Sequence, residues 1–96
     1  MILTGKCKED FLKWYYYNNY HHQVFTETSD DIFINALIIE WLDSVGIYIG
    51  ITYFKDSEFH WRIHYKDKYG TRNSRPEAIE QAIIKANEIY NERDII

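Results

Sequence analysis

Two stretches of the chain alternate between large apolar and polar residues, and this alternation constrains the fold more than any other feature. The apolar positions are Ile47, Ile49, Ile51 and Tyr53 in the first stretch and Phe59, Trp61, Ile63 and Tyr65 in the second. A period of two places such residues on one face of extended strands. The pattern therefore predicts an antiparallel β-hairpin whose apolar face is covered by helices.

The register of this hairpin follows from a turn near residues 55–57. If Phe54 lies opposite Glu58, the pairs on the apolar face are Tyr53–Phe59, Ile51–Trp61, Ile49–Ile63 and Ile47–Tyr65. The pairs on the outer face are then Thr52–His60, Gly50–Arg62 and Tyr48–His64. The eight apolar residues of the alternation all face the same way in this register, which supports it. Residues 66–73 are predicted to form a polar loop.

Two helices are predicted before the hairpin. The first covers about residues 6–18, with Thr4 as a possible N-cap and Cys7 on its inward face. The second starts from Ser29 as N-cap and ends at Gly46. Its main apolar stripe consists of Ile34, Leu37, Ile38, Trp41, Leu42 and Val45. A second apolar flank indicates burial on two sides, one against the hairpin and the other against the first helix or a second subunit.

A third helix is predicted after the polar loop. It opens with Ser74-Arg75-Pro76-Glu77, in which Ser74 and Glu77 match a capping box and proline suits the first turn. Its inward face carries Ile79, Ala82, Ile83, Ala86 and Tyr90, whereas Ile84 points the opposite way. The fold expected for residues 1–96 is thus a single α+β domain of order α-α-β-β-α, with its helices packed on one face of a small sheet.

Apolar residues outside the predicted core favour a homodimer over a monomer. They are Ile32, Ala36 and Ile39 on the second flank of the second helix, and Ile84 on the third helix. A two-stranded sheet also has two open edges, which favour pairing with another chain. These four residues are the candidates for self-association.

Length and charge limit the classes of function. The chain has 96 residues, and its 11 Lys and Arg against 15 Asp and Glu give a net charge of −4, which disfavours general nucleic-acid binding. The single cysteine cannot form an intramolecular disulfide and suits a reducing compartment. No stretch resembles a signal peptide or reaches the length of a membrane span, so we expect a cytoplasmic location.

Motifs for catalysis or metal binding are not apparent in the sequence. His60 and His64 would lie roughly 13 Å apart on one strand, too far to share an ion, and His21-His22 lacks further ligands. Cys7 on an inward helix face is expected to be a buried hydrophobe rather than a nucleophile. We find no glycine-rich phosphate loop, paired carboxylates or serine elbow. The chain is therefore expected to have no catalytic residues, cofactor, metal or small-molecule substrate, and not to be an enzyme.

The outer face of the hairpin is the candidate interaction surface. It combines aromatic and cationic side chains, namely Tyr48, Thr52, Phe54, His60, Arg62, His64 and Lys66. Tyrosine and arginine are enriched in protein–protein interfaces. Aromatic residues interleaved with basic ones are also typical of single-stranded nucleic-acid binders. A plain solvated sheet face is a third interpretation.

The element order over about residues 31–92 resembles that of small proteins encoded by phages, prophages and Bacteroidetes-type genomes. The matching pieces are Trp41-Leu42 before the strands and the helix opening at Ser74 to Ala78. That group has no assigned activity to transfer. A second resemblance is to HicB-type antitoxins, in which a hairpin also leads into a helix opened by a Ser/Thr and Glu-Ala box. The chain is expected to lack their third strand and their Pro-Asp turn.

The function expected from these features is that of a small non-enzymatic interaction or regulatory protein of a phage or mobile element. It would bind a protein partner, or a second copy of itself, through the surfaces named above. One alternative is a nucleic-acid-associated protein that uses the basic and aromatic hairpin face. Another alternative is an inhibitor of a host defence protein.

Overall fold

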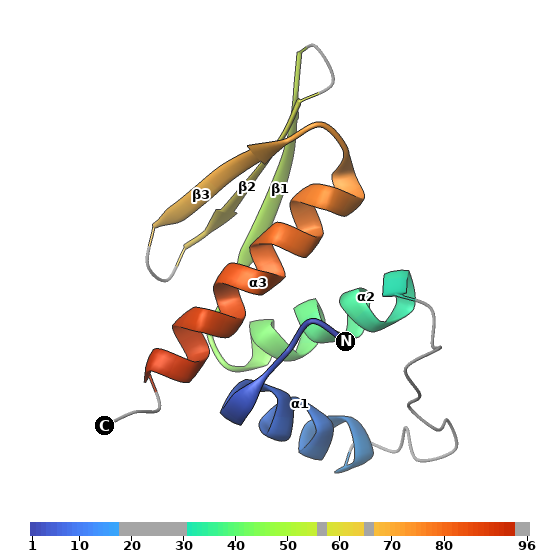
Figure 1. Ribbon diagram of the computed structural model, residues 1–96, viewed down its shortest axis with the longest axis vertical. Coiled ribbons are helices and arrows are strands. Elements are labelled where there is room, and N and C mark those ends of the chain that lie inside the picture. The colour runs from blue at the N-terminus through green and yellow to red at the C-terminus, as the bar shows by residue number, and fades with distance from the viewer. Residues whose placement is uncertain (18–30, 56–57, 65–66, 94–96) are drawn as a thin grey trace.

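The computed structural model describes residues 1–17, 31–55, 58–64 and 67–93. These residues form the helices α1 (Gly5–Tyr17), α2 (Asp31–Ser44) and α3 (Arg75–Arg93) and the strands β1 (Ile49–Phe54), β2 (Glu58–Ile63) and β3 (Lys68–Arg72) (Figure 1). The strands make one antiparallel sheet of order β1-β2-β3. The predicted α+β class is confirmed, with the order α-α-β-β-β-α. Among the described helices, none has both the length and the apolar character that crossing a membrane requires.

The pairing of β1 with β2 confirms the predicted hairpin register. On the inner face, Ile49 lies opposite Ile63, Ile51 opposite Trp61 and Tyr53 opposite Phe59. On the outer face, the predicted pairs Thr52–His60 and Gly50–Arg62 are also present. The Tyr48–His64 pair is joined by a hydrogen bond from the His64 N–H to the Tyr48 carbonyl, 3.2 Å long. Tyr65, the expected partner of Ile47, lies outside the described residues.

The third strand is a correction to the sequence-based prediction. Residues 68–72 were expected to belong to a polar loop, but they form β3 and pair with β2, with Gly70 opposite Trp61. The expectation that the chain lacks a third strand before the last helix is therefore wrong. The inner positions of β3 need no apolar side chain because the Trp61 indole covers Gly70: a Cβ atom there would lie 2.5 Å from Trp61 Nε1.

Helix α3 joins the sheet to the other two helices. Its N-terminal half packs on the inner face of the sheet, where Trp61 Nε1 donates a 2.6 Å hydrogen bond to Gln81 Oε1. The helix also packs on α1 and α2. Near its C-terminal end, the centroid of the Tyr90 ring lies 5.1 Å from that of Trp41 in α2. We expected one side of α2 to pack on the hairpin. Instead, α2 packs chiefly on α3 and α1, because α3 occupies the inner face of the sheet (Figure 1).

The predicted core and ending of α2 are confirmed. Its inward stripe is buried from Ile34 to Leu42, and Val45 is half-buried. The helix ends in a Schellman motif: Gly46 has a φ of 87°, and the Ile47 N–H donates to the Leu42 carbonyl over 2.9 Å. A positive φ suits glycine, which has no Cβ to clash. The predicted N-cap, Ser29, lies outside the described residues.

The predicted start and inward face of α3 are also confirmed. The Ser74 hydroxyl accepts a 3.3 Å hydrogen bond from the Glu77 N–H, as expected for an N-cap. The helix buries Ala82, Ile83, Ala86 and Tyr90, while Ile79 is half-buried. Ile84 points outward, with 42% of its surface exposed.

The N-terminus of α1 is capped by two asparagines of α3. Thr4 precedes the helix as predicted, but its hydroxyl accepts a hydrogen bond from Asn87 Nδ2 (2.9 Å). The Cys7 N–H, which an N-cap side chain would ordinarily satisfy, instead donates to Asn91 Oδ1 over 2.8 Å. Asn91 Nδ2 donates in turn to the Thr4 carbonyl (3.0 Å), and Asn87 Oδ1 accepts from the Thr4 N–H (3.0 Å). The two amides therefore fix the position of α1 on α3.

Replacing Asn91 by alanine is expected to lower the free energy of unfolding by about 1–2 kcal/mol, because the Cys7 N–H and the Thr4 carbonyl each lose a partner. The measurement is denaturant unfolding followed by circular dichroism. The adjacent Glu92 is exposed, so Glu92→Ala should change stability by less than about 0.5 kcal/mol. Equal effects of the two substitutions would contradict the capping role.

The Asp10 carboxylate ties α1 to α3 through Tyr90. The Tyr90 hydroxyl donates a 2.5 Å hydrogen bond to Asp10 Oδ2, and Lys6 Nζ lies 3.1 Å from Oδ1. Burial by itself raises the pKa of Asp10, but the hydrogen bond from Tyr90 and the charge of Lys6 outweigh it and hold the pKa below the ordinary value of 3.8. A carboxylate with a depressed pKa in the folded state stabilises the fold above its unfolded pKa.

This linkage predicts that stability falls as the pH drops below 3.8 and passes through the lower folded-state pKa of Asp10. Tyr90→Phe should reduce that pH dependence because it removes the hydrogen bond that favours the charged form. Unfolding free energies measured between about pH 2 and about pH 6 test this. Tyr16→Phe, which removes an exposed hydroxyl of α1, is the control and should leave the pH dependence unchanged. Parallel curves for Tyr90→Phe and the wild type would contradict the linkage.

Candidate functional site

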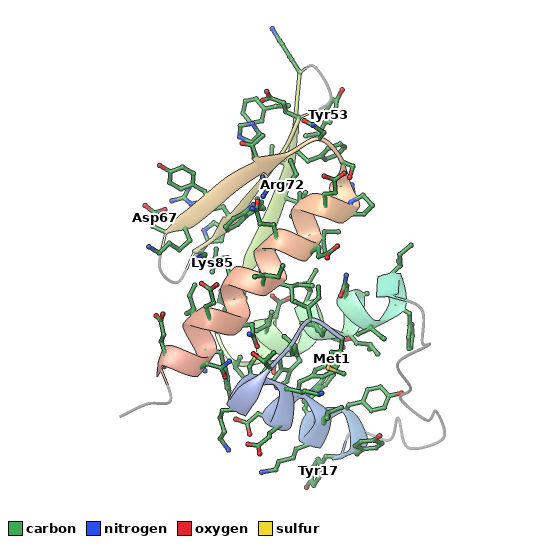
Figure 2. All side chains as sticks on the ribbon, in the orientation of Figure 1. Met1, Tyr17, Tyr53, Asp67, Arg72 and Lys85 are labelled. Carbon is green, nitrogen blue, oxygen red and sulfur yellow. The ribbon has the colours of Figure 1, made fainter. Side chains whose placement is uncertain are left out.

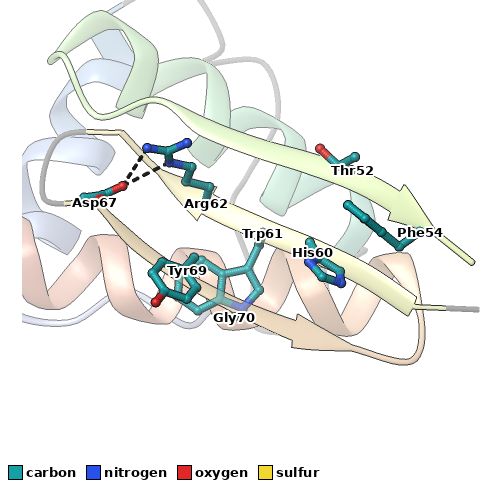
Figure 3. Close-up of a pocket in the computed structure, with 8 residues that line it drawn as sticks. All are labelled: Thr52, Phe54, His60, Trp61, Arg62, Asp67, Tyr69 and Gly70. Atoms are coloured by element: carbon teal, nitrogen blue, oxygen red, sulfur yellow. Dashed lines mark hydrogen bonds and ion pairs between the residues drawn. The ribbon is translucent and has the colours of Figure 1, made fainter.

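The candidate site is the outer face of the sheet, opposite α3. Alternate residues of neighbouring strands share this face, so β1 contributes Thr52 and Phe54, β2 contributes His60 and Arg62, and β3 contributes Tyr69. An open groove of about 460 Å³ lies among them (Figure 3). Its lining residues are Thr52, Phe54, His60, Trp61, Arg62, Asp67, Tyr69 and Gly70.

Four of the seven residues predicted for the interaction surface line this groove. They are Thr52, Phe54, His60 and Arg62. Tyr48 and His64 form the pair at the other end of the hairpin and do not line the groove. Lys66 lies outside the described residues.

Aromatic rings from all three strands border the groove. The rings of Phe54 and His60 are stacked, with centroids 4.2 Å apart and planes inclined by 23°. His60 Nε2 also lies 3.2 Å from Glu58 Oε2. Tyr69 projects from β3, and 77% of its surface is exposed. The groove therefore offers aromatic faces to a ligand on both sides.

An ion pair occupies the end of the groove near the turn between β2 and β3. Arg62 Nη2 and Nε both donate to Asp67 Oδ1, over 2.7 and 3.1 Å (Figure 3). Asp67 has a φ of 52°, a left-handed conformation that aspartate tolerates better than most residues. Both side chains are mostly exposed, and pairs of this kind contribute at most about 1 kcal/mol. A ligand carboxylate can therefore exchange with Asp67 at little cost.

The sequence-based prediction missed Asp67, Tyr69 and Gly70 because it assigned residues 66–73 to a loop. One local pattern points to the strand: Tyr69 and Thr71, two residue types that favour strands, stand at alternate positions. The charged residues and the glycine at the other positions conceal this pattern. The groove itself exists only because β3 supplies one of its walls.

The described residues contain no group of three or more His, Cys, Asp or Glu side chains that could hold a metal ion. Cys7 is fully buried on the inward face of α1, away from the groove. The groove thus presents aromatic rings, a hydroxyl and an ion pair, which are groups suited to binding. Comparisons of the chain with protein-family models, with curated proteins and with solved structures find no match.

The structure divides the residues predicted for self-association between two places. Ile32, Ala36 and Ile39 of α2 border an apolar groove of about 270 Å³, which Pro76 and Ile79 of α3 also line. Ile84 lies in a separate depression among Arg72, Glu77, Glu80 and Gln81. The α2 residues and Ile84 therefore do not form one continuous surface.

The close contact between Trp61 and Gly70 predicts different results for two glycine substitutions. Gly70→Ala is expected to destabilise the protein by about 1–3 kcal/mol, because the new methyl group would overlap the indole. At Gly50 the nearest atom to an added Cβ is His64 Nε2 at 3.6 Å, an ordinary contact. Gly50→Ala should therefore be neutral or slightly stabilising. Denaturant unfolding of both variants is the measurement, and equal effects would contradict the packing of Trp61 on β3.

Proposed function

We propose that this chain is a non-enzymatic interaction protein that binds a protein partner through the groove on the outer face of its sheet. The observation that carries the proposal is the exposure of large aromatic side chains around the groove: Phe54 is 51% exposed and Tyr69 is 77% exposed. Aromatic residues and arginine are the residue types most enriched where binding energy is concentrated in protein interfaces. An inhibitor of a host defence protein would be one form of such a protein.

The groove favours a partner segment that carries an apolar or aromatic side chain next to a carboxylate. The apolar group would lie between the Phe54–His60 stack and Tyr69. The carboxylate would bind Arg62, which directs two of its N–H groups to a single oxygen of Asp67. Among the described residues, Asp67 is the one hydrogen-bond acceptor for the Arg62 guanidinium. The other N–H groups of the guanidinium therefore remain available to a ligand.

Binding of single-stranded nucleic acid is the alternative, because bases could stack on the exposed rings of Phe54 and Tyr69. The charges of the described residues favour a protein partner instead. Asp67 pairs with Arg62, Glu58 lies beside His60, and the whole chain has a net charge of −4. Phosphate binding depends on cations that can replace counterions.

Selection from a phage-displayed peptide library tests the proposed function. Selected peptides should weaken about tenfold or more when Tyr69 is replaced by serine or Arg62 by alanine, since each substitution removes a central contact. Amide chemical shifts measured with the bound peptide should change along β1, β2 and β3 on the groove side. The dissociation constants can be measured by fluorescence anisotropy.

Tyr17→Ser is the matched control, because Tyr17 is an 88% exposed tyrosine on α1, at the end of the molecule away from Asp67 (Figure 2). It should leave peptide binding unchanged. Shift changes confined to another face would contradict the proposal. Binding of a single-stranded oligonucleotide that falls steeply with salt and is lost in Arg62→Ala would favour the alternative.

A further inference from the structure

Among the described strands, β1 lies at an edge of the sheet, and its own sequence lacks the features that usually prevent pairing. Its sequence, IGITYF, contains no charged residue and no proline. Edge strands of soluble proteins commonly carry lysine, proline or a bulge, which prevent association with another strand. The opposite edge strand, β3, has Lys68 and Arg72 at its two ends. The two edges of the sheet therefore differ in their capacity to pair.

The hydrogen-bond pattern identifies which backbone groups β1 directs outward. The His64 N–H donates to the Tyr48 carbonyl, so this pair belongs to the hydrogen-bonded set of the antiparallel ladder. Hydrogen-bonded pairs alternate along such a ladder, so Gly50 and Thr52 also direct their N–H and C=O groups toward β2. Ile49, Ile51 and Tyr53 direct theirs away from the sheet. Within the described part of the chain, no backbone hydrogen bond reaches these outward groups.

The inner-face side chains of β1 are also incompletely covered. Trp61 and Ile63 of β2 are 4% and 0% exposed, whereas Tyr53, on the same face of β1, is 59% exposed. The parity of the strand predicts Tyr53 as an inward residue, but the helical layer ends before reaching it.

We propose that the occupant of this edge is a second copy of the chain, paired antiparallel through β1 about a two-fold axis at Ile51. The outward residues are symmetric about that position. Ile51 would lie opposite Ile51 of the partner subunit, and Ile49 would lie opposite the partner's Tyr53. Each of these pairs exchanges two backbone hydrogen bonds, so every outward N–H and C=O group of the three residues gains a partner. The two three-stranded sheets then form one continuous sheet.

The side chains fit the same register on both faces. On the outer face, Tyr48 (54% exposed) would lie opposite the partner's Phe54, an aromatic pair. On the inner face, Ile49 would lie opposite the partner's Tyr53, a pair of a β-branched and an aromatic residue. Pairs of both kinds stabilise antiparallel strands, and the register opposes no two charges within β1. Tyr48, Tyr53 and Phe54, the three most exposed large side chains of this edge, thus all gain contacts in the dimer.

Size-exclusion chromatography with light scattering tests this dimer directly. The wild-type chain should be a dimer at micromolar concentration. Tyr53→Lys should raise the dissociation constant by about tenfold or more, because it places a charge opposite the partner's Ile49 in both symmetry-related pairs. Tyr69→Lys makes the same change at an exposed tyrosine of the other edge strand and should remain dimeric. A monomeric wild type, or dissociation by Tyr69→Lys in place of Tyr53→Lys, would overturn the proposal.

A cysteine at position 51 tests the axis itself. The native Cys7 is fully buried, so an introduced cysteine is the thiol available for oxidation. Hydrogen-bonded antiparallel partners have Cα atoms about 5.5 Å apart, within the range of a disulfide. Mild oxidation should link Ile51→Cys into covalent dimers and leave Tyr69→Cys unlinked. Covalent dimers of Tyr69→Cys but not of Ile51→Cys would overturn the proposal. Binding of an extended peptide along β1 while the chain stays monomeric would also overturn it. Because neither Ile51 nor Tyr53 lines the outer groove, failure of the dimer is distinguishable from failure of peptide binding.

Discussion

The packing of α3 is the constraint on which the rest of the structure depends. Among the described elements, α3 alone contacts all the others, namely the three strands, α1 and α2. Ala78, Ala82 and Ala86 are fully buried along it, which lets the neighbouring elements approach closely. A sheet of three short strands has little stability without a covering layer. The shape of the outer groove therefore depends on a helix that does not touch it.

Polar contacts, more than apolar ones, determine where α1 lies on this helix. Asn87 is the one buried polar residue in the described part of the chain, and both ends of its amide are bound by Thr4. An apolar surface can slide with little loss of contact, whereas a displaced amide would leave buried groups unpaired. In the described residues, every buried side-chain nitrogen or oxygen atom has a hydrogen-bond partner. The rings of Phe11, Trp41 and Tyr90 pack on one another between α1, α2 and α3, in the arrangement that these hydrogen bonds fix.

The sequence predicts the features that local spacing determines and misses those supplied by distant residues. Alternation was enough for the β1–β2 register, and the local residue types were enough for the ends of α2 and α3. Strand β3 was not predicted because its own inner positions carry no large apolar side chain. The apolar group that packs on Gly70 is the indole of Trp61, which belongs to another strand. The capping of α1 by Asn91 was not predicted for a similar reason, since Asn91 lies 84 residues from Cys7 in the sequence. Periodicity also indicates the face on which Tyr53 stands, but not whether a helix reaches that face.

The same reasoning explains why the candidate site was only half predictable. Thr52, Phe54, His60 and Arg62 follow from the hairpin alone, but a groove needs a second wall, and β3 supplies it with Tyr69. The third strand also makes the two edges unequal, because it places charges at one edge and leaves β1 uncharged at the other. In the proposed dimer the two-fold axis is perpendicular to the sheet, so both grooves lie on one continuous outer face. A partner that presents two copies of its binding segment on that side would bind both grooves, and the affinity would then depend on the dimer as well as on each groove.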